Sequence, residues 1–199
     1  MQSSTRFLTI LVLLLAGVLG RAAENYAERI APLIEPAKLA TLGDRGANPR
    51  IQKCVYWIEM ARRDGNNITN LVAAAVDLAN YTNRLAAQLT RESLLRNHRI
   101  ATGYQCLDAD GMSEMRQGKS PTIKRGTYKG DQLSVDHIVP RSVIPELDNI
   151  IANLELMPMR ANAKKKAGVG SRQVQKAEEL HRAGLLSMTG VQKVRAAAK

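Results

Sequence analysis

Apolar side chains recur at helical spacing through most of the first half of the chain. They form amphipathic patterns over residues 24–38 and 51–60, with the spacing of one helix face. No glycine or proline interrupts the similar pattern between Asn66 and Gly103, which predicts either one long helix or two helices in tandem. We therefore expect a helical region over residues 23–103. We expect it to act as a scaffold; a platform that binds substrate or a partner is the alternative.

Beyond this region the pattern changes to short apolar runs broken by glycine and proline. Asp136 lies among apolar and β-branched neighbours, and Glu155 lies between two leucines, as in short strands that face a core. A helical stretch containing Asn162 follows. The pattern predicts an α+β fold, with a small strand-containing module over residues 104–170 and C-terminal helices over residues 171–199.

Residues 1–22 have the features of a secretory signal peptide. Arg6 is a positive residue before an apolar run over residues 7–19, and Gly20-Arg21-Ala22 places small residues where a signal peptidase cuts. The run is shorter than the roughly 20 apolar residues of a membrane span. An uncleaved anchor is the alternative. We expect a protein that is secreted or periplasmic, without stable membrane association after cleavage.

Export affects the interpretation of the two cysteines, Cys54 and Cys106. In an oxidising compartment an even pair of cysteines predicts a disulfide. Two buried free thiols are the alternative. A zinc site is not expected, because two single cysteines and three scattered histidines lack the close spacing of zinc ligands.

The chain is strongly basic, with a formal net charge of +11, and the charge is unevenly distributed. Residues 111–199 contain 16 lysines and arginines against 8 acidic residues, so most of the excess lies in the second half. Such a concentration indicates a polyanionic partner, in particular nucleic acid. A basic surface that serves only solubility would fit an even distribution better.

The second half also contains residues suited to metal-dependent chemistry. Asp136 offers an anionic oxygen and Asn162 an amide oxygen, which are ligands that Mg²⁺ and Mn²⁺ accept. His137 offers an imidazole that can take a proton near neutral pH. In a regular strand, however, its side chain would point away from that of Asp136. These residue types suit a site that holds one metal and cuts phosphodiester bonds.

The order and spacing of these residues resemble the HNH endonuclease family. The resemblance lies in Asp136-His137-Ile138-Val139-Pro140, followed by Asn153 and then by Asn162-x-x-Lys165. It implies a ββα-metal (His-Me finger) module within residues 104–170, in which two strands and a helix surround one divalent metal. The zinc-binding cysteine pairs of many family members are absent, and the segment 143–152 lacks their usual glycine-rich turn.

The resemblance also implies roles for individual residues. Asp136 and Asn162 would bind the metal, His137 would activate the attacking water, and Asn153 would orient His137 through its backbone or ring. Asn153 as a simple turn or strand-entry residue is the alternative. Lys165 matches the family's lysine and would contact phosphate or fix the loop.

Three basic residues near the motif are candidates for nucleic-acid contact: Arg141, Lys164 and Lys165. For Arg141 and Lys164 a plain surface role is the alternative. His98 lies in a polar stretch without a neighbouring acid in the sequence, and we expect it on the surface.

The sequence therefore predicts an exported HNH endonuclease that hydrolyses DNA, or RNA, with Mg²⁺ or Mn²⁺. A non-catalytic nucleic-acid-binding protein that retains the HNH fold is the main alternative. A basic protein of the membrane surface is a third, which the few bulky apolar residues of the C-terminal stretch disfavour.

Overall fold

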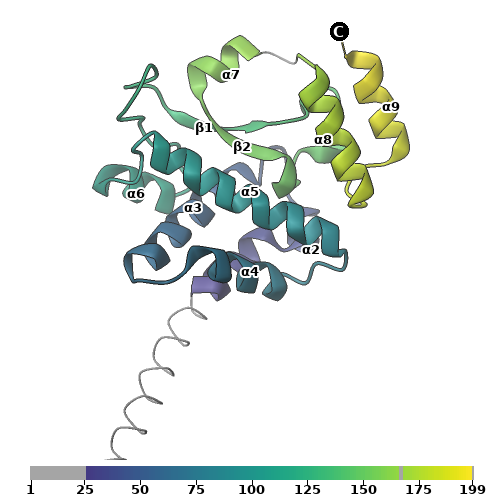
Figure 1. Cartoon of the computed structure of the whole chain (residues 1–199). Coiled ribbons are helices and arrows are strands. Elements are labelled where there is room, and N and C mark those ends of the chain that lie inside the picture. The colour runs from purple at the N-terminus through teal and green to yellow at the C-terminus, as the bar shows by residue number, and fades with distance from the viewer. Residues whose placement is uncertain (1–25, 166–167, 199) are drawn as a thin grey trace, which may run out of the picture.

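A computed structural model describes residues 26–165 and 168–198 of the chain. The expected signal peptide, residues 1–22, lies outside the described residues. Within them, no helix is long and apolar enough to cross a membrane. The structure combines many helices with one two-stranded antiparallel sheet, so the predicted α+β class is confirmed (Figure 1).

Most of the first half of the described chain is helical. Residues 26–34 form a helix. The elements that follow before the sheet are α2 (Pro36–Leu39), α3 (Asn48–Arg63), α4 (Ile68–Leu78), α5 (Arg84–Gly103) and α6 (Ala109–Arg116). The stretch between Asn66 and Gly103 therefore forms two helices in tandem.

Two asparagines begin these tandem helices. The side-chain oxygen of Asn67 accepts hydrogen bonds from the backbone N–H groups of Thr69 and Asn70. Asn83 does the same for the first turn of α5. An asparagine that caps N–H groups in this way starts a new helix. The caps explain why the stretch divides although it has neither glycine nor proline.

The second half contains the sheet and the remaining helices. They are β1 (Leu133–His137), the 3-10 helices η1 (Pro145–Leu147) and η2 (Ile151–Asn153), β2 (Leu154–Pro158), α7 (Met159–Lys165), α8 (Ser171–Arg182) and α9 (Met188–Ala197). The strands pair antiparallel, with Leu133 opposite Pro158 and His137 opposite Leu154. The order of two strands and a helix, β1-β2-α7, is that of the expected module.

Side chains alternate between the two faces of this sheet. Leu133, Val135 and His137 of β1 are buried on one face, and the intervening Asp136 is only partly buried. Asp136 lies opposite Glu155 in the register, so the two carboxylates share the other face. In Figure 1, α5 runs along one side of the sheet and α7 lies on the other.

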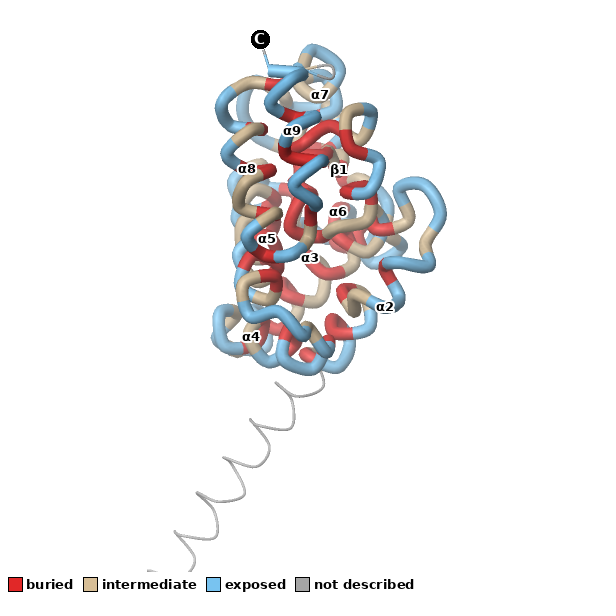
Figure 2. Tube along the Cα trace, turned by 90° about the vertical axis from the view of Figure 1, so that its right-hand side faces the viewer, coloured by how far each residue is buried: buried red, intermediate tan, exposed pale blue. Residues whose placement is uncertain are grey.

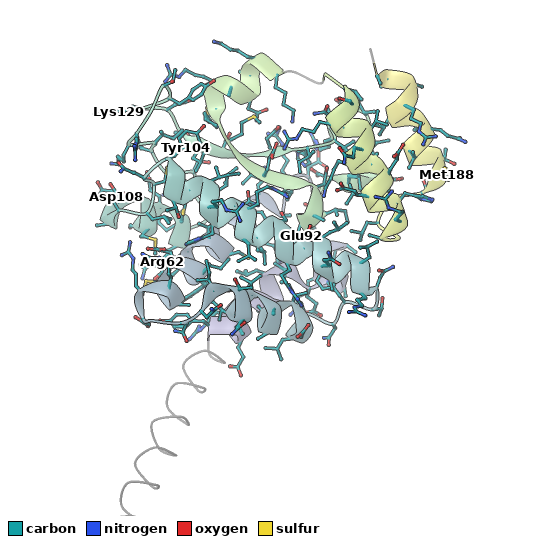
Figure 3. All side chains as sticks on the ribbon, viewed as in Figure 1. Arg62, Glu92, Tyr104, Asp108, Lys129 and Met188 are labelled. Carbon is teal, nitrogen blue, oxygen red and sulfur yellow. The ribbon has the colours of Figure 1, made fainter. Side chains whose placement is uncertain are left out.

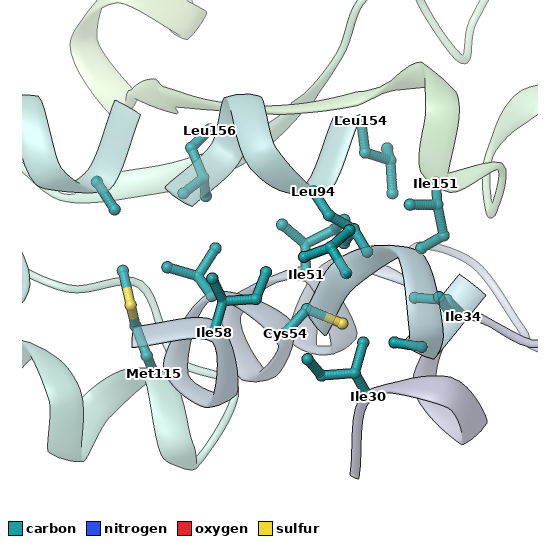
Figure 4. Packing of buried hydrophobic residues seen from close by; sticks show 14 of the residues in the cluster. Ile30, Ile34, Ile51, Cys54, Ile58, Leu94, Met115, Ile151, Leu154 and Leu156 are labelled. Atoms are coloured by element: carbon teal, nitrogen blue, oxygen red, sulfur yellow. The ribbon is translucent and has the colours of Figure 1, made fainter. Parts of the chain in front are cut away.

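The largest apolar cluster joins the helices to the sheet. Ile51 and Cys54 of α3 and Leu94 of α5 pack with Leu154 and Leu156 of β2 (Figure 4). In Figure 2, the buried stretches of α3, α5 and β1 adjoin one another. A second cluster joins α8 and α9 to the start of α5 and to the connection between the strands. The helical region and the strand-containing module thus share one core.

The expected Cys54–Cys106 disulfide is not formed in the structure, in which both cysteines are free and buried. Cys54 lies within α3, whereas Cys106 follows α5 and its Sγ lies 3.7 Å from the carbonyl oxygen of Tyr104. Burial raises the pKa of each thiol to about 12. The structure therefore shows the alternative arrangement, two buried thiols that are protonated at neutral pH.

His98 is a second correction, because it is buried and not on the surface. Its Nε2 lies 3.0 Å from Oε2 of Glu59, a residue 39 positions earlier in the chain. The acidic partner that the local sequence lacks is supplied by α3 when it packs against α5.

Candidate active site

Three of the residues singled out in the sequence meet at one cleft between β1 and α7. Asp136, His137 and Asn162 all line this cleft, which has a volume of about 310 Å³. Arg45, Pro140, Arg141, Ser142 and Ala163 complete its wall. A strand, the connection after it and a helix thus bring together residues that are up to 26 positions apart.

Asp136 points to the α7 side of the sheet. Its Oδ2 accepts a hydrogen bond from Nζ of Lys165 at 2.5 Å, and the same ammonium group donates to the carbonyl oxygen of His137 at 2.8 Å. Lys165 thereby holds the end of α7 against the end of β1. Its predicted partner was a phosphate or the loop, and in the structure it binds β1.

His137 points to the opposite face and is only 3% exposed. Its Nε2 lies 3.0 Å from the backbone oxygen and 2.9 Å from Oδ1 of Asp148. Both neighbours are acceptors, so Nε2 must carry the proton in the neutral ring. Nδ1 then keeps the lone pair that can accept a proton. The strand stays regular through His137, in contrast to the bend that the family resemblance implies.

Asp148 is held in turn by the helical half of the protein. Its Oδ2 accepts a hydrogen bond from the backbone N–H of Arg45 at 2.8 Å and lies 3.8 Å from Nη1 of Arg141. A carboxylate that binds a histidine ring fixes both the orientation and the tautomer of the ring. Asp148 is therefore placed to position His137.

Sequence reasoning missed this role of Asp148. The residue stood out only as a departure from the family pattern in segment 143–152. It belongs to a connection whose path depends on the contacts of Arg45 and Asn149 with the loop before α3. No periodicity marks such a residue, and the only signal was an acidic side chain between the apolar Leu147 and Ile150.

Asn153 is completely buried and fixes the backbone after β1. Its Oδ1 accepts from the N–H of Val139 at 2.9 Å, and its Nδ2 donates to the carbonyl oxygen of Val139 at 3.0 Å. Its own carbonyl accepts from the N–H of Ile138 at 2.8 Å. Asn153 thus acts on the two residues after His137, and not on the His137 ring.

The other candidate cations differ in their surroundings. Nη1 of Arg141 donates to Oδ2 of Asp44 at 2.7 Å, and this hydrogen bond raises the pKa of Arg141. Arg141 lines the cleft with part of its charge already neutralised. Lys164 is exposed on α7, and no ion pair to it occurs within the described part of the chain.

The donors that could hold a metal are oxygens. No group of three or more His, Cys, Asp or Glu side chains suited to a metal occurs among the described residues. Asp136 and Asn162 form a smaller set, and Mg²⁺ is commonly bound by one or two carboxylates while it keeps several waters. The hydrogen bond from Lys165 engages Oδ2 of Asp136 and leaves Oδ1 available. The chemistry of this pair fits Mg²⁺ or Mn²⁺ better than Zn²⁺.

We compared the chain with protein-family models, curated proteins and solved structures, and none of them matches it. The assignment of a function therefore depends on the residues and geometry described above.

Proposed function

We propose that this protein is an exported, metal-dependent endonuclease of the HNH type that hydrolyses phosphodiester bonds in DNA. One observation carries the proposal: Asp136, His137 and Asn162 line a single cleft formed by two antiparallel strands and the following helix. These are the residues and the order of elements that the HNH resemblance requires. Asn153, the remaining member of the motif, fixes the backbone that follows His137.

In the proposed mechanism, Nδ1 of His137 accepts a proton from the water that attacks the phosphorus atom. Asp148 keeps the proton of the neutral ring on Nε2 and stabilises the positive charge that develops on the imidazole. Asp136 and Asn162 would hold Mg²⁺, which supplies positive charge for the phosphate and the leaving 3′ oxygen. Lys165 is close enough to the same phosphate to neutralise charge once its contact with Asp136 is loosened.

DNA is the proposed substrate because the charge excess of residues 111–199 suits a nucleic-acid duplex and the HNH family cuts DNA. RNA presents the same phosphodiester and belongs among the substrates to be tested. Export is proposed from residues 1–22, and it would place the enzyme in the periplasm or outside the cell.

The alternative is a non-catalytic nucleic-acid-binding protein that retains this fold. Two observations favour it: His137 is 3% exposed, and Lys165 already neutralises Asp136. For catalysis, water must reach Nδ1 of His137 and Asp136 must exchange part of its contact with Lys165 for the metal. A binder needs neither event.

Cleavage of a supercoiled plasmid distinguishes the two functions. We expect the mature protein to nick the plasmid with Mg²⁺ or Mn²⁺ and to be inactive in EDTA. His137→Ala should lower the rate by about 100-fold or more, since a positioned base contributes factors of this size. His181→Ala is the matched control and should cut at the wild-type rate, because His181 bonds only the carbonyl of Leu186 at the start of α9.

Cutting that depends on Mg²⁺ but survives His137→Ala would contradict the assignment of the base. Binding of DNA without cutting under any divalent ion would establish the non-catalytic alternative. A parallel assay with single-stranded RNA decides which nucleic acid is cut faster.

A further inference from the structure

A basic arm lies beside the candidate active site and has no part in the mechanism above. We define it as residues 122–132, a loop closed at its base by a bridge between Thr122 and Gln132. Backbone hydrogen bonds join Ile123 to Asp131 and Gly130 to Ile123 at 2.8 and 2.9 Å. Ile123 is fully buried and anchors the arm in the apolar core. The arm is therefore a structured feature of the surface.

The arm is bonded directly to α7, the helix that contains Asn162. The backbone N–H of Met159 donates to the carbonyl of Gln132 at 2.9 Å, and the N–H of Arg160 donates to Oδ2 of Asp131 at 2.8 Å. The Arg160 guanidinium lies 5.9 Å from the ring centroid of Tyr128. Because Gln132 also leads into β1, the base of the arm contacts both elements that form the cleft.

The charge of this region is of one sign. Residues 116–130 contain five lysines and arginines and no acidic residue. Asp131 is neutralised by Arg160, whose Nε lies 3.4 Å from Oδ2, and Lys124 pairs with Asp108 and Asp110. Arg125 and Lys129 are exposed, and the described residues provide no ion pair for either of them. Lys129 lies at the periphery of the molecule, on the side away from Met188 of α9 (Figure 3).

We infer that the basic arm binds the phosphate backbone of duplex DNA on one side of the cleft, with Arg125 and Lys129 making the contacts. The inference rests on the proposed function, since the same duplex would enter the cleft. Phosphates that repeat along a strand match cations on the arm and on α7, where Lys164 is also exposed. These cations have no intramolecular ion pair to give up, so the contact costs little.

The test compares two double variants of equal charge. Arg125→Gln/Lys129→Gln removes the two arm cations; Arg182→Gln/Lys193→Gln removes two exposed cations from α8 and α9. Binding to a fluorescent 20-base-pair duplex is measured by anisotropy in EDTA at several salt concentrations, so that cleavage does not interfere. Each lost phosphate contact lowers the slope of log K against log salt by about 0.9, so the arm variant should lose about 2 in slope.

We also expect the arm variant to bind roughly tenfold more weakly at 0.1 M salt, because two ionic contacts are lost. In the presence of Mg²⁺ it should cleave with a raised KM and an unchanged kcat. The control should match wild type in both assays. Equal slopes for the arm variant and the wild type would overturn the inference.

The outcomes separate this inference from the proposed function. If wild type nicks plasmid with Mg²⁺ and the arm variant keeps its slope, the nuclease stands and the arm does not contact DNA. If wild type never cuts but the arm variant loses affinity and slope, the arm is a DNA contact of a non-catalytic binder. Circular dichroism of both variants checks that the loop substitutions leave the fold unchanged.

Discussion

At the scale of single residues, the contact between His137 and Asp148 determines what the site can do. The backbone oxygen and the carboxylate of Asp148 both approach Nε2 of His137. A neutral amide at position 148 could still accept a hydrogen bond, but it could not stabilise a positive imidazole electrostatically. The carboxylate therefore matters for the charged transition state more than for the resting structure.

We expect Asp148→Asn to lower kcat for DNA cleavage by about 10- to 100-fold while KM changes little, as is typical of a residue that supports the base. Glu146→Gln, two residues away in η1, removes the same charge from an exposed side chain and should keep kcat. Steady-state cleavage assays with both variants provide the comparison. A rise in KM with constant kcat would show that Asp148 acts in binding instead.

At the scale of elements, α5 stabilises the free edge of β2. The sheet has only two strands, so β2 exposes unpaired backbone groups on the side away from β1. Asn97 of α5 accepts from the N–H of Leu156 at 2.7 Å and donates to the carbonyl of Leu154 at 3.1 Å. Ser93 also donates to the Leu154 carbonyl, at 3.1 Å. Side chains of the helix thus bond β2 as a third strand would.

Replacing Asn97 should destabilise the protein through these backbone groups. We expect Asn97→Ala to lower the free energy of unfolding by about 2–3 kcal/mol, because it leaves a buried N–H without a partner. Arg99→Ala on the exposed side of the same helix should cost less than about 0.5 kcal/mol. Urea unfolding followed by circular dichroism measures both. Equal effects of the two substitutions would mean that Asn97 contributes only helix propensity.

At the scale of the whole molecule, a buried charge cluster connects three parts of the chain. Glu59 of α3 accepts hydrogen bonds from Arg62 and Arg63 and lies 3.0 Å from Nε2 of His98 on α5. Arg63 also donates to the carbonyl of Leu107 before α6. Burial alone would raise the pKa of Glu59, but these hydrogen bonds outweigh it and lower the pKa to about 2.

The cluster predicts a defined pH dependence of stability. The carboxyl of Glu59 has its usual pKa near 4.5 in the unfolded chain and about 2 in the folded one, so its contribution is complete above pH 4.5 and is lost as the pH falls towards 2. Its size is about 3 kcal/mol, at roughly 1.4 kcal/mol per pKa unit.

We expect urea midpoints to show that Glu59→Gln is destabilising at pH 7 and much less so at pH 2.5. Glu28→Gln, an exposed acid in the first described helix, is the control with no such pH dependence. A Glu59→Gln effect of the same size at both pH values would contradict the cluster's role.

The sequence determined the local elements and the chemistry of the site. Helical periodicity located most of the helical half, and alternation around Asp136 and Glu155 located the two strands. The order of Asp136, His137 and Asn162 predicted residues that the structure brings to one cleft. Such features are readable because they depend on neighbouring positions and on residue type.

Only the tertiary structure decided which distant side chains meet. It paired His98 with Glu59, kept Cys54 and Cys106 apart, and turned Asn153 towards Val139 instead of His137. It also brought Asp148 to His137. These contacts depend on how α3 and α5 pack against the hairpin and on the path of the connection between β1 and β2. That packing is set by burial of the shared core, which no local pattern specifies.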